Sequence, residues 1–402
     1  MPRSSRRTLP RVWPPRAQSS APLAVKSTSR CTRPEVRIGI AGAGLLGRLL
    51  ALELAQAGHV VEVFDPAPDA QARGAAGWTA AGMLSPVAEL ECANTDVFAL
   101  GMRSLALWPG ICSRLGIPGA VAIKGSLLLA HRGDEGAAQR VVALLRHKAP
   151  EGHAPQLLTH SHMHTLEPAI HGPAHAWLLP AEGQIDTVQA MVALALGATE
   201  HGVQWHWGHT VHGLAPGRVQ TTHATVCFDH VFDVRGTGAR AADRTHSLPL
   251  AAGPVRGVRG ELLWLHAPGV QLQRPLRLLH PRHRVYLVPR PQDRIIVGAS
   301  EIESEDRSPI SLRSTVELLA AAHCVLPALA EARLIHTETN LRPALPDNLP
   351  HIERSDGCTR INGLFRHGWL IAPALVEQAL ARLRAPGCPD VAPAPDLAAE
   401  AA

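Results

Sequence analysis

The sequence predicts an α/β chain, α+β overall, in which a nucleotide-type domain is interwoven with a domain built on an antiparallel sheet. Two observations carry this prediction. A strand–helix–strand unit directly follows position 35, whereas the region after about position 200 is rich in strands and a helix closes the chain. Early nucleotide-type units and late antiparallel strands are expected of two discontinuous domains, not of two domains laid end to end.

The predicted division follows these shifts in character. Residues 36–82, 183–243 and 355–384 are expected to form the nucleotide-binding domain, and residues 83–182 and 244–354 the second domain. Residues 1–34 are rich in Pro, Ser and Arg and are expected to be a disordered basic extension. Residues 385–402 are expected to be a loose Pro/Ala-rich tail.

The first unit is the clearest. Residues 36–41 form an apolar β-branched run, residues 45–57 carry apolar side chains at helical spacing, and residues 59–64 form a second strand-like run that ends at Asp65. Strand, turn, helix and strand within about 30 residues indicate a βαβ unit.

The later elements are read in the same way. Further helices are predicted at 98–115, 136–147, 187–201, 311–326 and 374–383. Further strands are predicted at 122–130, 203–207, 219–226, 230–234, 262–265, 284–288 and 294–297. Asp186 is a predicted N-cap with Gln189 three residues later, and Pro-Arg-Pro-Gln-Asp between the last two strands indicates a hairpin.

Charge and cysteine usage exclude several classes. Residues 1–34 carry eight of the 39 Lys and Arg and no acid, which leaves 31 basic against 34 acidic residues in the rest of the chain. The basic pI of 9.0 therefore describes the extension and indicates no nucleic-acid face. Seven scattered cysteines without C-x-x-C spacing favour a reducing compartment, so a cytoplasmic protein is expected.

Neither a metal site nor a membrane span is expected. His160, His162 and His164 alternate in a polar stretch, but a metal site there is disfavoured. No apolar run reaches the ~18–20 residues that a membrane helix needs. The basic extension lacks the apolar segment of a secretory signal.

The strongest local motif is VRIGIAGAGLLG, which contains Gly42, Gly44 and Gly47 as G-x-G-x-x-G between a strand and a helix. Gly42 permits the tight turn, Gly44 lets the backbone approach a pyrophosphate, and Gly47 lets helix and strand pack closely. Asp65, 18 residues after Gly47, is placed to accept the ribose hydroxyls. The motif predicts dinucleotide binding, disfavours NADP, and by itself leaves FAD and NAD open.

Longer stretches resolve that choice. The chain resembles the D-amino-acid oxidase family of FAD-dependent flavoproteins, and most resembles the glycine oxidases of thiamine biosynthesis. The motifs that carry the resemblance are the glycine motif, GWTAAGMLSPVAEL, GQIDTVQAM, FDVRGTGAR, VYLVPRPQDRIIVGASEIESED, TNLRPALPDNLPHI and NGLFRHGWLIAPALVEQAL, in this order. They cover most of residues 36–383.

The resemblance implies a Rossmann-like FAD-binding domain and a set of cofactor-binding residues. The small-residue segment of the second motif would lie beside the flavin ring, and Val211 would contact the adenine end through its backbone. The N-terminus of the last helix would point at the pyrimidine end of the flavin, where its dipole favours negative charge. The full set is Gly42, Gly44, Leu45, Leu46, Gly47, Asp65, Ala80, Ala81, Gly82, Met83, Val211, Gly236, Arg366, Gly368, Trp369 and Leu370.

Three residues are expected to be catalytic. Oxidation of an amino acid by flavin delivers the Cα hydride to flavin N5, so the substrate's amine must be neutral and its Cα must be held above the ring. By the resemblance, Arg342 binds the substrate carboxylate, for which a planar guanidinium is suited. Tyr286, the only tyrosine in the chain, would form a pocket wall, Arg366 would lie close to flavin and substrate, and Met83 would lie near the substrate.

The chain also departs from the family. Relatives usually carry Thr or Ser near positions 76–77 and a His before the late aromatic-Arg pair, whereas this chain has Ala76, Gly77 and Leu364. Hydrogen bonds to the cofactor are therefore expected to be rearranged. No cysteine falls in the context that attaches FAD covalently in some relatives, so FAD is predicted to be non-covalent.

The function expected from the resemblance is an oxidase for a small amino acid, with glycine as the best candidate. Glycine, oxygen and water would give glyoxylate, by way of the imine, with ammonia and hydrogen peroxide, and the imine would feed thiamine biosynthesis. A D-amino-acid or sarcosine oxidase or dehydrogenase is the alternative within the family. An NAD-dependent dehydrogenase and a non-catalytic flavoprotein subunit are alternatives of other classes. The expected partners are the amino acid and oxygen, without nucleic acid, in a homo-oligomer.

Overall fold

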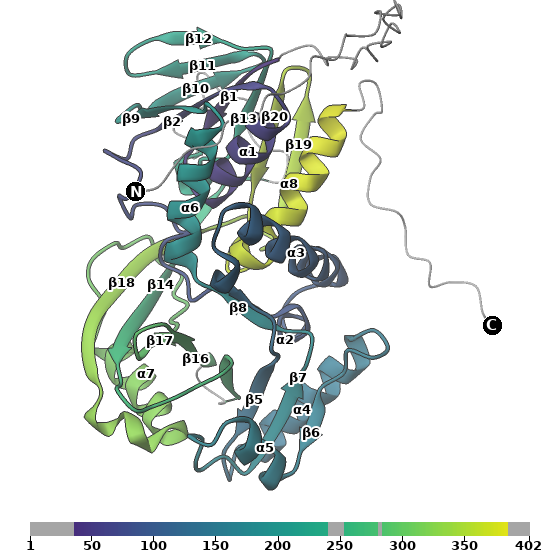
Figure 1. Ribbon diagram of the computed structural model, residues 1–402, viewed down its shortest axis with the longest axis vertical. Coiled ribbons are helices and arrows are strands. Elements are labelled where there is room, and N and C mark those ends of the chain that lie inside the picture. Colours follow the sequence, from purple (N-terminus) through teal and green to yellow (C-terminus); the bar gives the residue numbers. More distant parts are fainter. Residues whose placement is uncertain (1–35, 240–252, 280–283, 385–402) are drawn as a thin grey trace, which may run out of the picture. The chain divides into compact units, whose positions relative to one another are not determined.

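The computed structural model describes residues 36–239, 253–279 and 284–384, which belong to one compact unit. The predictions for residues 1–34 and 385–402 lie outside the described residues. Two large sheets carry most of the strands (Figure 1).

The first sheet has six strands and contains the predicted βαβ unit. Its order is β19 (His351–Ser355), β20 (Cys358–Asn362), β13 (His230–Asp233), β1 (Arg37–Ala41), β2 (Val60–Asp65) and β9 (Gln204–Trp207). All neighbours are parallel except β19, which pairs with β20 in the antiparallel sense. Parallel strands joined through helices are typical of a dinucleotide-binding sheet, so the predicted fold class is confirmed.

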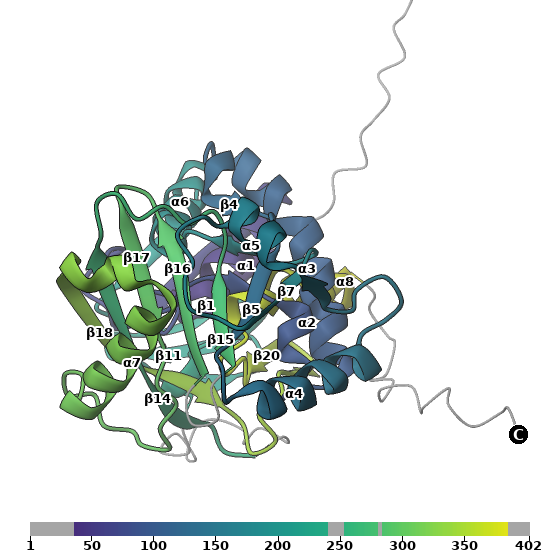
Figure 2. The same cartoon turned by 90° about the horizontal axis from the view of Figure 1, so that it is seen from below.

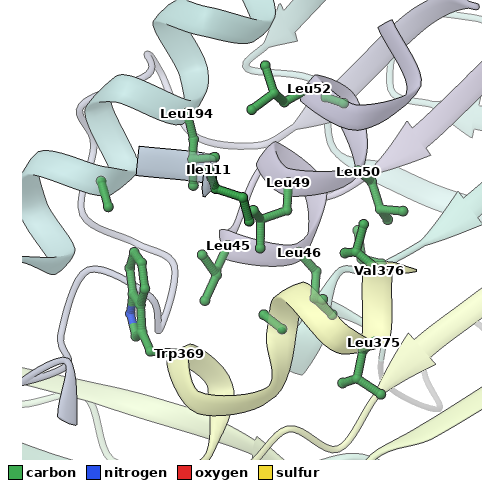
Figure 3. Packing of buried hydrophobic residues seen from close by; sticks show 14 of the residues in the cluster. Leu45, Leu46, Leu49, Leu50, Leu52, Ile111, Leu194, Trp369, Leu375 and Val376 are labelled. Carbon is green, nitrogen blue, oxygen red and sulfur yellow. The ribbon is translucent and has the colours of Figure 1, made fainter. Parts of the chain in front are cut away.

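Helix α1 (Leu45–Gln56) lies at the centre of the packing around this sheet. Leu49, Leu50 and Leu52 are at most 1% exposed. Figure 3 shows the leucines of α1 beside Leu194 of α6 (Thr187–Glu200), Ile111 of α3 (Thr95–Arg114) and residues of α8 (Gly368–Arg384). Most of α1 is apolar and must be buried, and the first sheet together with these helices buries it.

The second sheet has eight strands and is mostly antiparallel. Its order is β18 (Arg333–Ala344), β14 (Arg256–His266), β17 (Arg294–Gly298), β16 (Arg284–Arg290), β15 (Leu276–Leu279), β5 (Ser126–Ala130), β7 (His175–Leu179) and β6 (Gln156–Leu158). Helices α7 (Leu312–Val325) and α4 (Glu135–Lys148) pack against different parts of it (Figure 2).

Side-chain alternation along β16 gives this sheet two different faces. Val285 and Leu287 point into the cluster covered by α7. Tyr286 and Val288 belong to the opposite cluster, together with Ala81 from the nucleotide-binding side. Successive residues of a strand point to opposite faces. The register of β16 therefore places Tyr286 on the face that packs against Ala81, away from α7.

Smaller elements complete the fold. One three-stranded sheet comprises β10 (Val211–Ala215), β11 (Arg218–Thr221) and β12 (Thr225–Cys227), and another comprises β3 (Met83–Leu84), β8 (Gly183–Ile185) and β4 (Val121–Ala122). Short helices are α2 (Pro86–Glu89) and α5 (His160–Leu166), and 3-10 turns span Pro118–Ala120, Gly236–Gly238 and Pro327–Glu331.

The predicted elements differ from the structure mainly at their ends. The predicted strands at 122–130 and 219–226 are each two strands, because the chain turns at Gly125 (φ 82°) and between β11 and β12. The last helix begins at Gly368 and passes through Pro373. The predicted N-cap is confirmed, since the Asp186 side chain accepts from the backbone N–H of Gln189 at 3.0 Å.

The predicted hairpin is also confirmed. Strands β16 and β17 pair in the antiparallel sense, with positive φ at Gln292 and Asp293 in the turn. Among the described residues, no helix is long and apolar enough to span a membrane. Within the same residues, no group of three His, Cys, Asp or Glu side chains could hold a metal ion.

Candidate active site

A cavity of about 1360 Å³ runs between the glycine turn after β1 and the face of the second sheet that carries Tyr286. Its volume exceeds the ~300–1,000 Å³ typical of a site for one drug-sized molecule. At one end it is lined by Asp65, Thr210 and Val211, and at the other by Tyr286 and Arg342. The cavity therefore has room for a dinucleotide and a small second molecule.

The glycine turn is built as the motif predicts. Gly42 has φ 103°, and a Cβ on Gly47 would lie 1.8 Å from the Gly42 carbonyl oxygen, so only glycine fits at this crossing of β1 and α1. Gly44 is the N-cap of α1, and no side chain caps the helix. The positive end of α1 therefore presents backbone N–H groups to the cavity, as an anion-binding helix N-terminus does.

Asp65 lines the same end and also stabilises the turn. Its two carboxylate oxygens accept from the backbone N–H groups of Ala43 at 2.6 Å and Ala67 at 2.8 Å. Each oxygen keeps a further lone pair for a hydroxyl group. The proposed ribose contact is thus combined with a structural role that the sequence did not indicate.

Arg48 is a buried cation that the sequence analysis missed. It is 1% exposed and donates to the backbone oxygens of Ala43 at 2.8 Å, Met191 at 2.7 Å and Ala70 at 2.7 Å. Burial lowers the pKa of Arg48 to about 10 and nearby Asp65 opposes this shift, so Arg48 is cationic at neutral pH. Its guanidinium lies 5.2 Å from the ring centroid of Trp78, a cation–π contact. One side chain thus connects the glycine turn, α6 and the loop that follows β2.

The small-residue segment that was expected beside the flavin lines the middle of the cavity. Gly82 has φ 67°, and a Cβ there would lie 2.1 Å from the Ile185 oxygen, so the segment packs tightly against β8. Arg290, another residue that the sequence analysis missed, donates to the backbone oxygens of Ala81 and Ile185. Arg290 thus connects the segment before β3 to β8, and this holds the turn before Met83 in place.

The start of α8 reaches the cavity at Gly368, Trp369 and Leu370. The Trp369 indole N–H donates to the Gly77 carbonyl at 2.9 Å, and the Trp108 indole N–H donates to the Trp369 carbonyl at 2.9 Å. A Cβ on Gly77 would lie 3.2 Å from Leu45 and 3.3 Å from the Met191 sulfur. The departure from Thr or Ser at this position therefore fits its crowded surroundings.

Glycines on neighbouring strands make room for the two predicted substrate residues. A Cβ on Gly298 would lie 2.7 Å from the Tyr286 hydroxyl, and a Cβ on Gly260 would lie 2.4 Å from a guanidinium nitrogen of Arg342. Burial raises the pKa of Tyr286 above its ordinary value, against the opposing effect of Arg342, so its hydroxyl stays protonated and can donate a hydrogen bond.

Within the described residues, Arg342 donates hydrogen bonds to backbone carbonyls only. Its guanidinium donates to the Ser300 oxygen at 3.0 and 3.1 Å and to the Arg259 oxygen at 3.4 Å. Burial lowers the pKa of Arg342. None of the hydrogen bonds that Arg342 makes within the described residues goes to a carboxylate, so a carboxylate arriving from the cavity could accept hydrogen bonds from this cation.

Arg366, by contrast, is already paired. Its Nε and Nη2 donate to Oε2 of Glu89 at 2.8 and 2.7 Å, and its Nη1 donates to Glu301 at 3.2 Å. His367 Nε2 lies 2.9 Å from the same oxygen of Glu89, and Arg277 donates to the other oxygen at 2.7 Å. Glu89 is therefore surrounded by three basic side chains.

This environment controls the charge of Glu89. Burial alone would raise its pKa, but Arg366, Arg277 and the hydrogen bond with His367 hold the pKa well below its usual range. Glu89 is therefore ionised at neutral pH although it is buried. Glu89 lies near the end of the motif GWTAAGMLSPVAEL, in which only the small residues were predicted to contribute to the site.

The structure thus brings nearly all predicted residues to one cavity. Gly47 is the exception, because it packs against Gly42 and does not line the space. Most residues that the sequence analysis missed are buried and charged or titratable, and Glu301 is the exposed one. They are Arg48, Glu89, Arg277, Arg290, His367 and Glu301. Sequence spacing gives no signal for them, since their partners come from distant elements.

The residues present fit FAD. The uncapped N-terminus of α1 can bind the pyrophosphate, Asp65 can accept from the ribose, and the start of α8 lines the same cavity. No cysteine of the described ranges lines the cavity. Non-covalent attachment stays a prediction.

Comparisons with known proteins agree with this geometry. The model of the family of FAD-dependent oxidoreductases named DAO matches residues 37–382. A Rhizobium etli protein, whose name assigns it to thiamine biosynthesis as the oxidoreductase ThiO, is 36% identical over 349 residues, which is 87% of this chain and 96% of that protein.

Solved structures show the same fold. The glycine oxidase of Geobacillus kaustophilus superposes with a TM-score of 0.74 at 26% identity, covering 87% of this chain and 94% of that one. The glycine oxidase of Bacillus cereus gives a TM-score of 0.75 at 22% identity, with 87% and 97% coverage.

The chain belongs to the DAO family of FAD-dependent oxidoreductases. The resemblance read from the sequence, the cofactor FAD and the enzyme class are therefore confirmed. The NAD-dependent dehydrogenase that the glycine motif left open is thereby excluded.

Replacing Arg48 by Met should weaken FAD binding. The variant removes the three hydrogen bonds by which Arg48 connects the glycine turn to α6 and to the loop after β2. The Kd for FAD should therefore rise about tenfold or more. Arg103→Met, which removes an exposed pair with Glu377, is the matched control. An unchanged Kd in an Arg48→Met protein that unfolds at the wild-type temperature would contradict the assigned role.

Replacing Glu89 by Gln should destabilise the protein in a pH-dependent way. Breaking a buried ion pair costs about 3–5 kcal/mol, because the basic partners are left uncompensated. Since the folded-state pKa of Glu89 is depressed, its contribution is present above about pH 4.3 and is lost as the pH falls further toward the folded-state pKa.

The measurement is urea unfolding of wild type and variant, with FAD, at about pH 7 and at about pH 3.5, on either side of the ordinary glutamate pKa. The difference in unfolding free energy should be smaller at the lower pH. Glu377→Gln, at an exposed pair, should differ little from wild type at neutral pH. A Glu89→Gln difference that is equally large at both pH values would refute the electrostatic account.

Proposed function

We propose that this enzyme is an oxidase that deaminates a small amino acid, with glycine as the best candidate. Glycine, oxygen and water give glyoxylate, by way of the imine, with ammonia and hydrogen peroxide, and the imine enters thiamine biosynthesis. The proposal is supported by the names of the Rhizobium etli and Geobacillus kaustophilus relatives. A D-amino acid or sarcosine is the alternative substrate within the same chemistry.

The observation that carries the proposal is Arg342. It is a cation in the cavity that, among the described residues, donates hydrogen bonds to carbonyl oxygens only, and Tyr286 interacts with it electrostatically. A small molecule with one carboxylate fits this arrangement, because a planar guanidinium binds carboxylate in two hydrogen bonds. The protonated Tyr286 hydroxyl adds a further donor and a wall of the pocket.

The other site residues have supporting roles in the proposal. Arg366, paired with Glu89, adds positive charge beside Arg342 and fixes the segment before α8. Met83 and the segment of small residues before it border the space for the ring. Bound FAD supplies the hydride acceptor, at N5 of the flavin. The chain's own residues orient the substrate so that its Cα lies at contact distance.

The decisive experiment mixes the purified yellow protein anaerobically with glycine, sarcosine and D-alanine. At least one should bleach the visible flavin band within the time of a turnover, and glycine is expected to do so. Oxygen should then restore the band with release of hydrogen peroxide. If none of the three bleaches the band, amine oxidation is wrong.

Arg342→Ala should raise the KM for the amino acid strongly while FAD stays bound. Loss of a charge-assisted bidentate pair costs about 1.5–3 kcal/mol or more, which is at least about tenfold in KM. Arg103→Ala is the control, because Arg103 lies on the surface and does not line the cavity. Unchanged kinetics in Arg342→Ala would place the carboxylate elsewhere.

The homo-oligomer and the cytoplasmic location expected from the sequence stay predictions. The assignment of the discontinuous segments to a cofactor-binding and a substrate-binding domain also stays an interpretation.

A further inference from the structure

Five charged groups meet around the substrate end of the cavity. Tyr286 interacts electrostatically with Arg342, Arg277, Glu89 and Arg366, and Glu301 interacts with both Arg342 and Arg366. Three cations and two carboxylates therefore face one another. The pairing of these groups indicates how many negatively charged groups of a substrate the site can accommodate.

The positive charges of Arg277 and Arg366 are paired with carboxylates of the protein. Arg277 donates to Oε1 of Glu89 at 2.7 Å, and Glu182 lies close to it on the buried side, where it does not line the cavity. Each of the three guanidinium nitrogens of Arg366 donates to a carboxylate, two to Glu89 and one to Glu301. Arg342 donates only to carbonyl oxygens of the described residues, which leaves it available for one substrate carboxylate.

Glu301 differs from Glu89 in its exposure. Its side chain is 45% exposed, whereas Glu89 has 11% side-chain exposure. Glu301 also directly follows Ser300, whose carbonyl accepts two of the three hydrogen bonds from the Arg342 guanidinium. A carboxylate thus faces open space next to the cation that would bind the substrate.

We propose that Glu301 is a specificity-determining residue that restricts the site to amines with a single carboxylate. Its carboxylate occupies Nη1 of Arg366 and repels a second anionic group on the substrate. Simple amino acids such as glycine or sarcosine are accepted, and amines with two carboxylates are rejected. This inference rests on the proposed function, because it assumes that Arg342 binds the substrate carboxylate.

The test uses two substrates that differ by one carboxylate, sarcosine and iminodiacetate. In Glu301→Gln, the ratio of kcat/KM for iminodiacetate to that for sarcosine should rise about tenfold or more, because like-charge repulsion is removed and Nη1 of Arg366 is released. Glu301→Asp, which keeps the charge, should stay within about threefold of the wild-type ratio.

Glu303→Gln is the matched control, since Glu303 is 68% exposed, pairs with Arg256 and does not line the cavity. It should leave the ratio at the wild-type value. A folded, yellow Glu301→Gln protein with an unchanged ratio would overturn the inference.

A binding experiment separates this inference from the proposed function. Acetate and malonate, which carry one and two carboxylates, are titrated into the holoenzyme while the visible flavin spectrum is followed. Wild type should bind acetate more tightly than malonate, and Glu301→Gln should reverse or abolish the preference. If no amine bleaches the flavin, the proposed function fails, yet this comparison still decides the role of Glu301. Equal affinity of wild type for both anions would show that Glu301 does not discriminate.

Discussion

The rest of the site depends on the ion pairs and hydrogen bonds of the buried Glu89 carboxylate. It accepts from Arg366, which precedes α8 beside the first sheet, and from Arg277 of β15 in the second sheet. A buried charge is tolerated only when it is paired and hydrogen-bonded. Glu89 therefore fixes the relative positions of two parts of the fold that border the cavity, and it leaves Arg342 as the cation for a ligand.

The cofactor end of the cavity is organised by a different buried charge. Arg48 donates only to backbone carbonyls, and these belong to the glycine turn, to the loop after β2 and to α6. A cation paired with neutral oxygens adds positive charge near the end of the cavity where the pyrophosphate is expected. Turn geometry and electrostatics thus favour the same ligand.

Much of the fold and of the site could be read from the sequence. Three features were local patterns: the G-x-G-x-x-G turn, the acid at the end of β2 and the hairpin of β16 and β17. Such patterns are predicted correctly because short-range sterics and hydrogen bonds determine them. Boundaries were less accurate. The last helix begins six residues before its predicted start and contains Pro373, since packing against α1 and α3 supports a turn that propensity alone would end.

The sequence alone predicted the dinucleotide turn and the family correctly, and it predicted Tyr286, Arg342 and Arg366 as site residues, whose roles stay predictions. Only the tertiary structure decided how the charges pair. Arg342 and Arg366 are indistinguishable as sequence letters, yet in the described part of the chain Arg342 donates only to carbonyls and Arg366 donates to two carboxylates. The physical reason is that pairing depends on distances between side chains 65 to 277 residues apart, such as Arg366 with Glu301 and with Glu89, and no local pattern encodes those distances.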